Sequence, residues 1–399
     1  MVGGVVASAL GRKRGLMIAA VLFIISAVGS AYPEMGFPHG APHTFLTQFI
    51  IYRIIGGVGV GLASMLSPMY IAEMAPASRR GGLVAWNQFA IIFGMLVVYF
   101  VNYFIALNGD EAWLTSTGWR LMFLSEVIPA ALLFLLVLGV PESPRWLIMK
   151  GREAKAVAIL ERINGAPEAE VEAQSIRRSL HGTVKAKLFS YGVGVIVIGM
   201  LLSVFQQFIG INVVLYYAPE IFRNMGMGTN AALAQTIIVG VINLSFTVLA
   251  IFTVDRFGRR PLMIIGSLGM AVSMVTLGMT FFLEQMGFLS LLAMLCYVAS
   301  FAVSWGPICW VLLAEIFPNK IRSQAMALAV AAQWVANYLV SWTFPMMDKS
   351  TYLNGIFHHA FAYWIYALMA VLAALFMWRF VPETKGRPLE EMEKLFAEK

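Results

Sequence analysis

The sequence predicts an all-α membrane protein, and three observations point to that fold class. Of the 399 residues, 60% are hydrophobic and 12% are charged, as is typical of chains that cross a membrane many times. Apolar runs recur at about the 20-residue length that a helix needs to span a bilayer. Basic residues gather in short segments, and two apolar runs lie between each of these segments and the next. The ten predicted crossings are 16–34, 45–73, 83–106, 120–140, 190–218, 231–253, 262–283, 288–316, 323–346 and 360–381.

The basic segments also predict the orientation. Most of the 28 Lys and Arg residues fall in the segments 12–14, 79–80, 145–187, 256–260, 320–322 and 379–399. Two predicted helices separate each segment from the next, so all six lie on one side, which an excess of Lys and Arg marks as cytoplasmic. We therefore expect both termini inside, on the cytoplasmic side of the membrane. The net charge of +7 then reflects topology, and no nucleic-acid partner is expected.

Two charged residues interrupt the apolar runs of the first half. Arg53 opens the second crossing and Glu126 lies inside the fourth. A charge at bilayer depth is expensive and marks a functional candidate, so Arg53 and Glu126 are a possible pair. The alternative is that the Arg53 side chain extends to the outer interface. The expected organisation is an N-terminal bundle over 1–140, a cytoplasmic loop with short helices over 141–188, a C-terminal bundle over 189–383 and a tail over 384–399.

A polar stretch inside the fifth crossing is the strongest candidate site. Gln206, Gln207, Asn212 and Tyr216 follow one another in an apolar run. At 3.6 residues per turn, Gln206, Asn212 and Tyr216 share one broad face of a continuous helix. Amides and a phenol without charge suit a neutral ligand with many hydroxyl groups. The alternative is that the amides join neighbouring helices.

Other positions in the second half add to this candidate. Asn243 interrupts the sixth crossing, and the residues around Gly306 and Pro307 break the eighth, because proline removes a backbone hydrogen bond. Gln333 and Trp334 lie together in the ninth. The chain carries no nucleophile motif, metal-ligand cluster or nucleotide loop, so we expect neither an enzyme nor a cofactor or metal site.

Three motifs on the predicted inner side occur twice at nearly constant separation. Gly11-Arg12-Lys13 matches Gly258-Arg259-Arg260, Glu73-x-x-Pro76-x-x-x-Arg80 matches Glu315-x-x-Pro318-x-x-x-Arg322, and Pro141-Glu142 matches Pro382-Glu383. Such spacing indicates two homologous halves. The crossings 190–218 and 231–253 precede the second copy of the first motif, but only ten residues precede the first. We therefore expect two helices that the repeat calls for to be missing before Gly11.

Together these motifs resemble the sugar porters of the major facilitator superfamily, most closely its bacterial proton-coupled D-xylose carriers, over essentially the whole chain. The motifs that carry the resemblance are Asp255-Arg256-Phe257-Gly258-Arg259-Arg260, Pro141-Glu142-Ser143-Pro144-Arg145, Gln206-Gln207-x4-Asn212, Gly306-Pro307-x-x-Trp310 and Pro382-Glu383-Thr384-Lys385-Gly386. The resemblance implies a major-facilitator fold of two pseudo-repeated bundles, here with ten helices instead of twelve. It also implies transport of a monosaccharide, xylose or a related pentose or hexose, by proton symport with alternating access.

The resemblance further implies residue roles. The sugar-contacting positions would be Gln88, Gln206, Gln207, Asn212, Tyr216, Asn243, Gly306, Trp310, Gln333 and Trp334. The proton-coupling positions would be Arg53 and Glu126, because the family's proton-accepting aspartate lies on the missing first helix. A cytoplasmic latch that holds the inner ends together in the outward-open state would use Arg12, Glu73, Arg80, Glu142, Arg145, Asp255, Arg259, Glu315, Arg322 and Glu383. The alternatives are helix packing for the tryptophans and plain topology signals for the latch charges.

Three interpretations of the whole chain remain. The first is a carrier that works as a monomer with a monosaccharide, protons and the lipid bilayer as its partners. The second is a membrane sensor that binds a sugar without moving it. The third is a truncated, inactive gene product. On the first interpretation, we expect proton-coupled accumulation to need the two missing helices.

Overall fold

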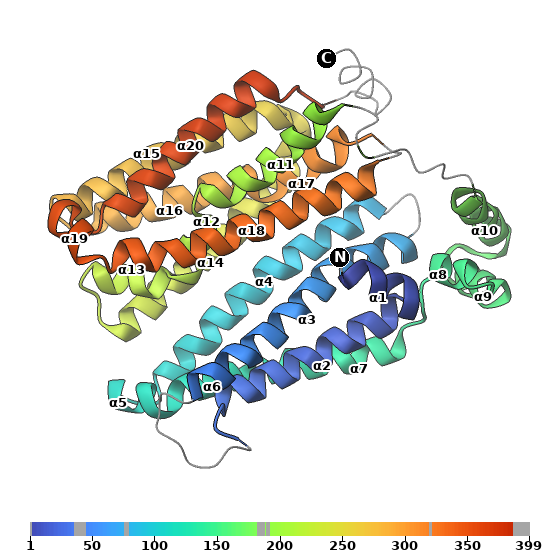
Figure 1. The fold of residues 1–399 in the computed structure, drawn as a ribbon, viewed down its shortest axis with the longest axis horizontal. Helices are drawn as coiled ribbons and strands as arrows, with labels where there is room; N and C mark the ends of the chain where they lie inside the picture. The colour runs from blue at the N-terminus through green and yellow to red at the C-terminus, as the bar shows by residue number, and fades with distance from the viewer. Residues whose placement is uncertain are drawn as a thin grey trace. The chain divides into compact units, whose positions relative to one another are not determined.

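The fold is helical throughout the residues that the structure, a computed structural model, describes: 2–35, 45–75, 80–181, 188, 192–318 and 321–385 (Figure 1). Ten helical segments there are long and apolar enough to cross a membrane, which confirms the predicted fold class. They are Arg12–Ala31, Phe45–Met74, Trp86–Ala106, Glu111–Gly139, Val193–Tyr216, Thr229–Val254, Arg259–Phe282, Phe288–Leu313, Gln324–Asp348 and Phe361–Phe380. The chain forms two compact units, described separately below.

The first unit comprises residues 1–91 and 101–183. Its helices are α1 (Val2–Leu10), α2 (Arg12–Ala31), α3 (Phe45–Met74), most of α4 (Arg80–Ala106), α5 (Glu111–Trp113), the π-helix η2 (Leu114–Gly118), α6 (Trp119–Ser125), α7 (Val127–Gly139), α8 (Pro144–Met149), α9 (Glu153–Asn164) and α10 (Ala166–His181). Helix α2 packs along α3 and α7. Glycines make the α2–α3 approach close, because a Cβ at Gly56 would lie 2.4 Å from the Ser26 hydroxyl and one at Gly59 would lie 3.0 Å from the Phe23 ring.

The fourth crossing differs from its predicted bounds. It begins at Glu111, ahead of the predicted start at 120, and it turns at Glu126 between α6 and α7. Pro129 explains the turn, since it has no N–H to offer the carbonyl of Ser125 one helical turn earlier. The backbone tightens there, and the Glu126 N–H bonds the Phe123 carbonyl at 3.2 Å.

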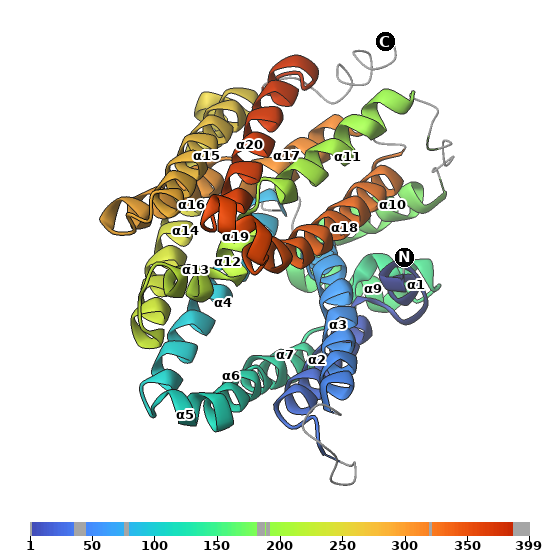
Figure 2. The same cartoon turned by 60° about the vertical axis from the view of Figure 1, so that its left-hand side comes forward.

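The second unit comprises residues 184–399 together with the middle of α4, residues 92–100. Its helices are α11 (Val193–Phe208), α12 (Ile211–Tyr216), α13 (Ala218–Asn224), α14 (Thr229–Phe257), α15 (Arg259–Phe282), α16 (Phe288–Val303), α17 (Trp305–Ile316), α18 (Arg322–Asp348), α19 (Thr351–Phe357) and α20 (Phe361–Phe380). Helix α15 packs along α16 and α20, and α11 lies beside α18 (Figure 2). The Tyr99 hydroxyl of α4 donates to the Leu215 carbonyl at 2.9 Å, which ties the α4 middle to α12.

Two crossings of the second unit are broken. The eighth breaks at Ser304, because Pro307 in the first turn of α17 cannot bond the carbonyl one turn before it. The fifth breaks at Gly210, which adopts the left-handed conformation with φ of 91°. Both breaks lie next to the polar candidate residues.

Candidate functional site

A cluster of buried amides joins three helices of the second unit. Gln206 and Gln207, at the end of α11, are only 3% and 5% exposed. The Gln206 Nε2 donates to the Trp305 carbonyl of α17 at 2.9 Å, and the Gln333 Nε2 of α18 donates to the Gln206 Oε1 at 2.5 Å. Gln206 therefore acts as the centre of the cluster, with a donor and an acceptor engaged on different helices.

The cluster continues across the break of the fifth crossing. Asn212 of α12 donates from its Nδ2 to the Gln207 Oε1 at 2.5 Å and to the Asn337 Oδ1 at 2.9 Å. The Ser341 hydroxyl donates to the same Asn337 oxygen at 3.3 Å. Asn337 thus belongs to the cluster although it was not among the predicted sugar-contacting positions, and its spacing of one helical turn from Gln333 was the available signal.

The expected continuous helix face is wrong, and the break explains why. Residues five apart, such as Gln207 and Asn212, point to different sides of an unbroken helix. The left-handed Gly210 turns the chain between them, so their side chains meet. Tyr216, which would share the Gln206 face of an unbroken helix, is 55% exposed, but its hydroxyl still forms a hydrogen bond with Asn337 of the cluster.

The other predicted sugar positions fall into three groups. Trp310 and Trp334 present large rings that are 36% and 45% exposed. Gly306 is buried beside the cluster, since its carbonyl lies 3.5 Å from the Gln206 Nε2. Asn243 is buried on α14, and within the described residues no recorded hydrogen bond joins it to the amides. Gln88 belongs to the first unit, where it is half-buried on α4.

One hydrogen-bond acceptor of the amide cluster has no partner among the described residues. The Gln333 Oε1 is buried and has no hydrogen-bond partner among the described residues. A buried acceptor without a partner costs about 1–3 kcal/mol, so a hydroxyl donor placed here is favourable. The amides do join neighbouring helices, as the alternative interpretation held. The spare acceptor, together with tryptophan rings that are partly exposed on α17 and α18, also equips the cluster for a polyhydroxylated ligand.

Arg53 and Glu126, the two charged residues that interrupt the apolar runs of the first half, lie beside one another. The Arg53 Nη1 is 3.7 Å from the Glu126 Oε2, and the side chains are 45% and 42% exposed. The Arg53 guanidinium also lies over the Phe123 ring, 5.1 Å from its centroid. Glu126 reaches Arg53 from the turn between α6 and α7, so the break at Pro129 helps to place this carboxylate.

The inner-side motifs of the first unit form one compact charge cluster. The Arg12 guanidinium pairs with Glu73 at 2.8 Å, with side chains only 9% and 12% exposed, and the Ser143 hydroxyl donates to the other Glu73 oxygen. The Glu142 carboxylate accepts the backbone N–H groups of Arg12 and Lys13, at 2.9 and 3.1 Å. Glu142 therefore caps the start of α2, where the unpaired N–H groups of a helix favour an anion.

The second unit repeats this cluster residue for residue. Arg259 pairs with Glu315 at 3.0 Å, and the Thr384 hydroxyl donates to Glu315 at 2.5 Å. Glu383 accepts the N–H groups of Arg259 and Arg260, so it caps α15 as Glu142 caps α2.

Of the remaining predicted latch residues, the structure describes the side chain of Arg145 alone. Arg145 is exposed. The side chains of Arg80, Asp255 and Arg322 lie outside those that the structure describes. Each recorded pair joins two motifs of the same unit, Arg12 with Glu73 and Arg259 with Glu315.

Comparison with known proteins gives a consistent result. The chain matches the sequence pattern of the family described as sugar (and other) transporter over residues 1–396. It is 61% identical to the D-xylose-proton symporter of Escherichia coli K12, over 99% of this chain and 82% of that protein. It is 41% identical to the glucose facilitated diffusion protein of Zymomonas mobilis, over 99% of this chain and 84% of that protein. The inward open structure of the E. coli xylose transporter superposes with a TM-score of 0.87 at 59% identity, over 98% of this chain and 84% of that one.

Proposed function

Because the chain belongs to the sugar transporter family, a family of membrane transporters and not of enzymes, we propose that it carries a monosaccharide, D-xylose foremost, together with protons. The observation that supports this most is the amide cluster of Gln206, Gln333 and Asn212 with its spare buried acceptor. A relative that is 61% identical is a D-xylose-proton symporter, which favours a pentose and proton coupling.

The sugar contacts follow from the chemistry of the cluster. Amide donors and acceptors can bond the hydroxyl groups of a pyranose in fixed directions, and an analogue without one of these hydroxyls leaves an amide unpaired. The partly exposed rings of Trp310 and Trp334 suit the apolar C–H face of the same sugar. We also propose that the carrier works as a monomer.

Proton coupling is assigned to the Arg53–Glu126 pair. The Glu126 carboxylate can form an ion pair with Arg53 only when it is charged, so protonation of this carboxylate releases the arginine to other partners. If protonation and sugar binding each favour the same conformation, the two ligands are coupled reciprocally. Glu126 is the titrating group in this proposal, and Arg53 is its partner.

The proposal is tested by uptake into vesicles that hold the purified protein. With labelled D-xylose and an inward proton gradient, uphill uptake that a protonophore abolishes is expected if the Arg53–Glu126 pair carries the proton. Exchange of xylose without uphill uptake would instead support the expectation that accumulation needs the two helices that the repeat calls for. Glu126→Gln should lose uphill uptake while xylose still exchanges across the vesicle membrane, because a neutral amide cannot carry the proton. Glu111→Gln, an exposed acid at the start of α5, is the matched control and should accumulate normally. Failure of the unsubstituted protein to bind or move any sugar would refute the function, and normal accumulation by Glu126→Gln would place the proton site elsewhere.

We also propose that both termini and the loop 141–188 face the cytoplasm of a bacterial cell. This rests on the distribution of Lys and Arg. In a Cys296→Ser background, which removes the exposed native thiol, cysteines are introduced as Lys155→Cys in α9 and Tyr352→Cys in α19. An impermeant thiol reagent added to intact cells should label the α19 position and leave the α9 position unlabelled. The reverse pattern would invert the topology.

A further inference from the structure

The joint between α11 and α12 separates two parts of the proposed sugar site. Gln206 and Gln207 precede it, and Asn212 follows it. The joint consists of Ile209, which caps α11, and Gly210, with a left-handed φ of 91°. The angle at these two residues therefore sets where the Asn212 amide lies relative to the glutamines.

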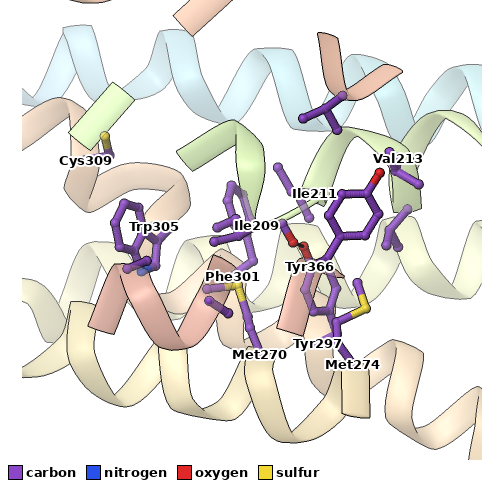
Figure 3. Packing of buried hydrophobic residues seen from close by; sticks show 14 of the residues in the cluster. Ile209, Ile211, Val213, Met270, Met274, Tyr297, Phe301, Trp305, Cys309 and Tyr366 are labelled. Atoms are coloured by element: carbon purple, nitrogen blue, oxygen red, sulfur yellow. Dashed lines mark hydrogen bonds between the residues drawn. The ribbon is translucent and has the colours of Figure 1, made fainter. Parts of the chain in front are cut away.

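The Ile209 carbonyl is held by a side chain from another helix. Tyr297 of α16 is fully buried, and its hydroxyl donates to the Ile209 oxygen at 2.6 Å (Figure 3). The backbone bonds recorded at the joint run from Gly210 to the Gln207 carbonyl and from Val214 to the Gly210 carbonyl. In this described stretch, no backbone N–H is recorded on the Ile209 carbonyl, so Tyr297 provides its partner.

A second aromatic ring holds the same joint by contact. A Cβ at Gly210 would lie 2.7 Å from the Tyr366 ring, so the α20 side chain abuts the glycine directly. The joint is thus enclosed by a hydrogen bond from α16 and a ring from α20. The Tyr366 hydroxyl itself, like that of Tyr363, is buried without a hydrogen-bond partner among the described residues.

We propose that Tyr297 is a positioning residue for the sugar. Tyr297 has no recorded contact with the amide side chains of the described cluster; it fixes the backbone joint, and the joint fixes Asn212 against Gln207 at 2.5 Å. The inference rests on the proposed function, since it assigns a role within the same sugar site. It predicts that one hydroxyl, which bonds the backbone and not the amide side chains, affects the affinity for the sugar.

The test is Tyr297→Phe, which removes the hydroxyl and keeps the ring. We expect the dissociation constant for D-xylose to rise about 5–30-fold, because a buried carbonyl that loses its partner shifts the joint toward other conformations. The matched control is Tyr363→Phe, which removes a buried hydroxyl that bonds no described residue. Its dissociation constant should stay within about twofold of the parent value. Binding is measured by tryptophan fluorescence or calorimetry on monodisperse protein in detergent.

A double-mutant cycle separates positioning from general stability. If Tyr297 acts through Asn212, then Tyr297→Phe should cost little more affinity once Asn212→Ala is present. A merely structural role would lower the unfolding temperature and the folded fraction but leave the affinity of the folded fraction unchanged. Equal dissociation constants for Tyr297→Phe and the parent, or additive effects in the cycle, would overturn the inference.

A second variant keeps the inference testable if Tyr297→Phe does not fold. Tyr366→Leu removes the ring that abuts Gly210 and leaves the Tyr297 hydroxyl in place. It should weaken xylose binding in the same direction and also be non-additive with Asn212→Ala. Unchanged affinity in this variant counts against the proposal. A parent protein that binds no sugar would refute the proposed function instead, so the two failures are distinguishable.

Discussion

Replacing Glu73 by alanine should destabilise the protein by about 3–5 kcal/mol, because the substitution leaves a buried arginine without its counter-charge. The Arg12 and Glu73 side chains are 9% and 12% exposed, and their atoms approach to 2.8 Å. Glu73 also accepts the Ser143 hydroxyl, so the substitution removes two interactions that join α2, α3 and the segment before α8. We expect a lower thermal unfolding midpoint in detergent, together with reduced transport.

The matched control is an ion pair that water surrounds. Arg177 pairs with Glu153 at 2.8 Å, but the side chains are 36% and 47% exposed. The Glu170 carboxylate lies 3.8 Å from the same Arg177 guanidinium and is a second partner. Glu153→Ala should therefore cost less than about 1 kcal/mol. Glu315→Ala, in the repeated cluster, should act in the same direction as Glu73→Ala. Equal shifts of the thermal unfolding midpoint for Glu73→Ala and Glu153→Ala would show that the Arg12–Glu73 pair contributes no more to stability than an exposed ion pair.

Replacing Gln206 by alanine should weaken D-xylose binding by about 10–100-fold, with the protein still folded. The reason is the central place of this amide: its Nε2 holds the Trp305 carbonyl and its Oε1 holds the Gln333 amide. The truncation removes the contacts that we propose Gln206 makes with the sugar, and it frees Gln333 to move. Losses of two linked hydrogen bonds are larger than the loss of one exposed bond.

Equilibrium binding of xylose and of its deoxy analogues measures this effect. The parent should discriminate against analogues that lack a hydroxyl, and Gln206→Ala should discriminate less, since fewer amides are left unpaired. Gln285→Ala changes an exposed amide between α15 and α16 and serves as the control. Unaltered affinity and selectivity in the Gln206 variant would move the sugar site away from this cluster.

The crossings of the bilayer were predictable because they depend on local composition. Twenty apolar residues and flanking charges suffice to indicate a spanning helix, and ten such segments are present in the structure. The start of the fourth crossing was not predictable in this way. Its first turns, residues 111–118, contain Glu, Thr, Ser and Gly, which lower the local hydropathy although the chain is already helical there.

The candidate site was only partly predictable, since its contacts are tertiary. The residue types Gln206, Gln207 and Asn212 were recognisable from their cost at bilayer depth. Their mutual bonds were not, because these depend on the left-handed Gly210, and glycine in an apolar run is usually a packing residue.

The charged residues on the inner side were also only partly predictable: their repeat was visible in the sequence, but their ion-pair partners were not. The repeat predicted that Glu73 and Glu315 play equivalent roles, but it did not identify the arginine that each of them pairs with. The structure pairs Glu73 with Arg12 and Glu315 with Arg259, residues distant in sequence that meet only when the helices pack.

The carboxylate caps of α2 and α15 bear on the order in which the chain is made. The first residues of α2 acquire their cap only when Glu142, which follows the last crossing of the first unit, has been synthesised. The first residues of α15 wait in the same way for Glu383. Domains generally fold as units, in order from the N-terminus, as a chain emerges from the ribosome. The first unit can therefore close on itself while the second is still unmade, and the second closes only when the ribosome has passed its last crossing.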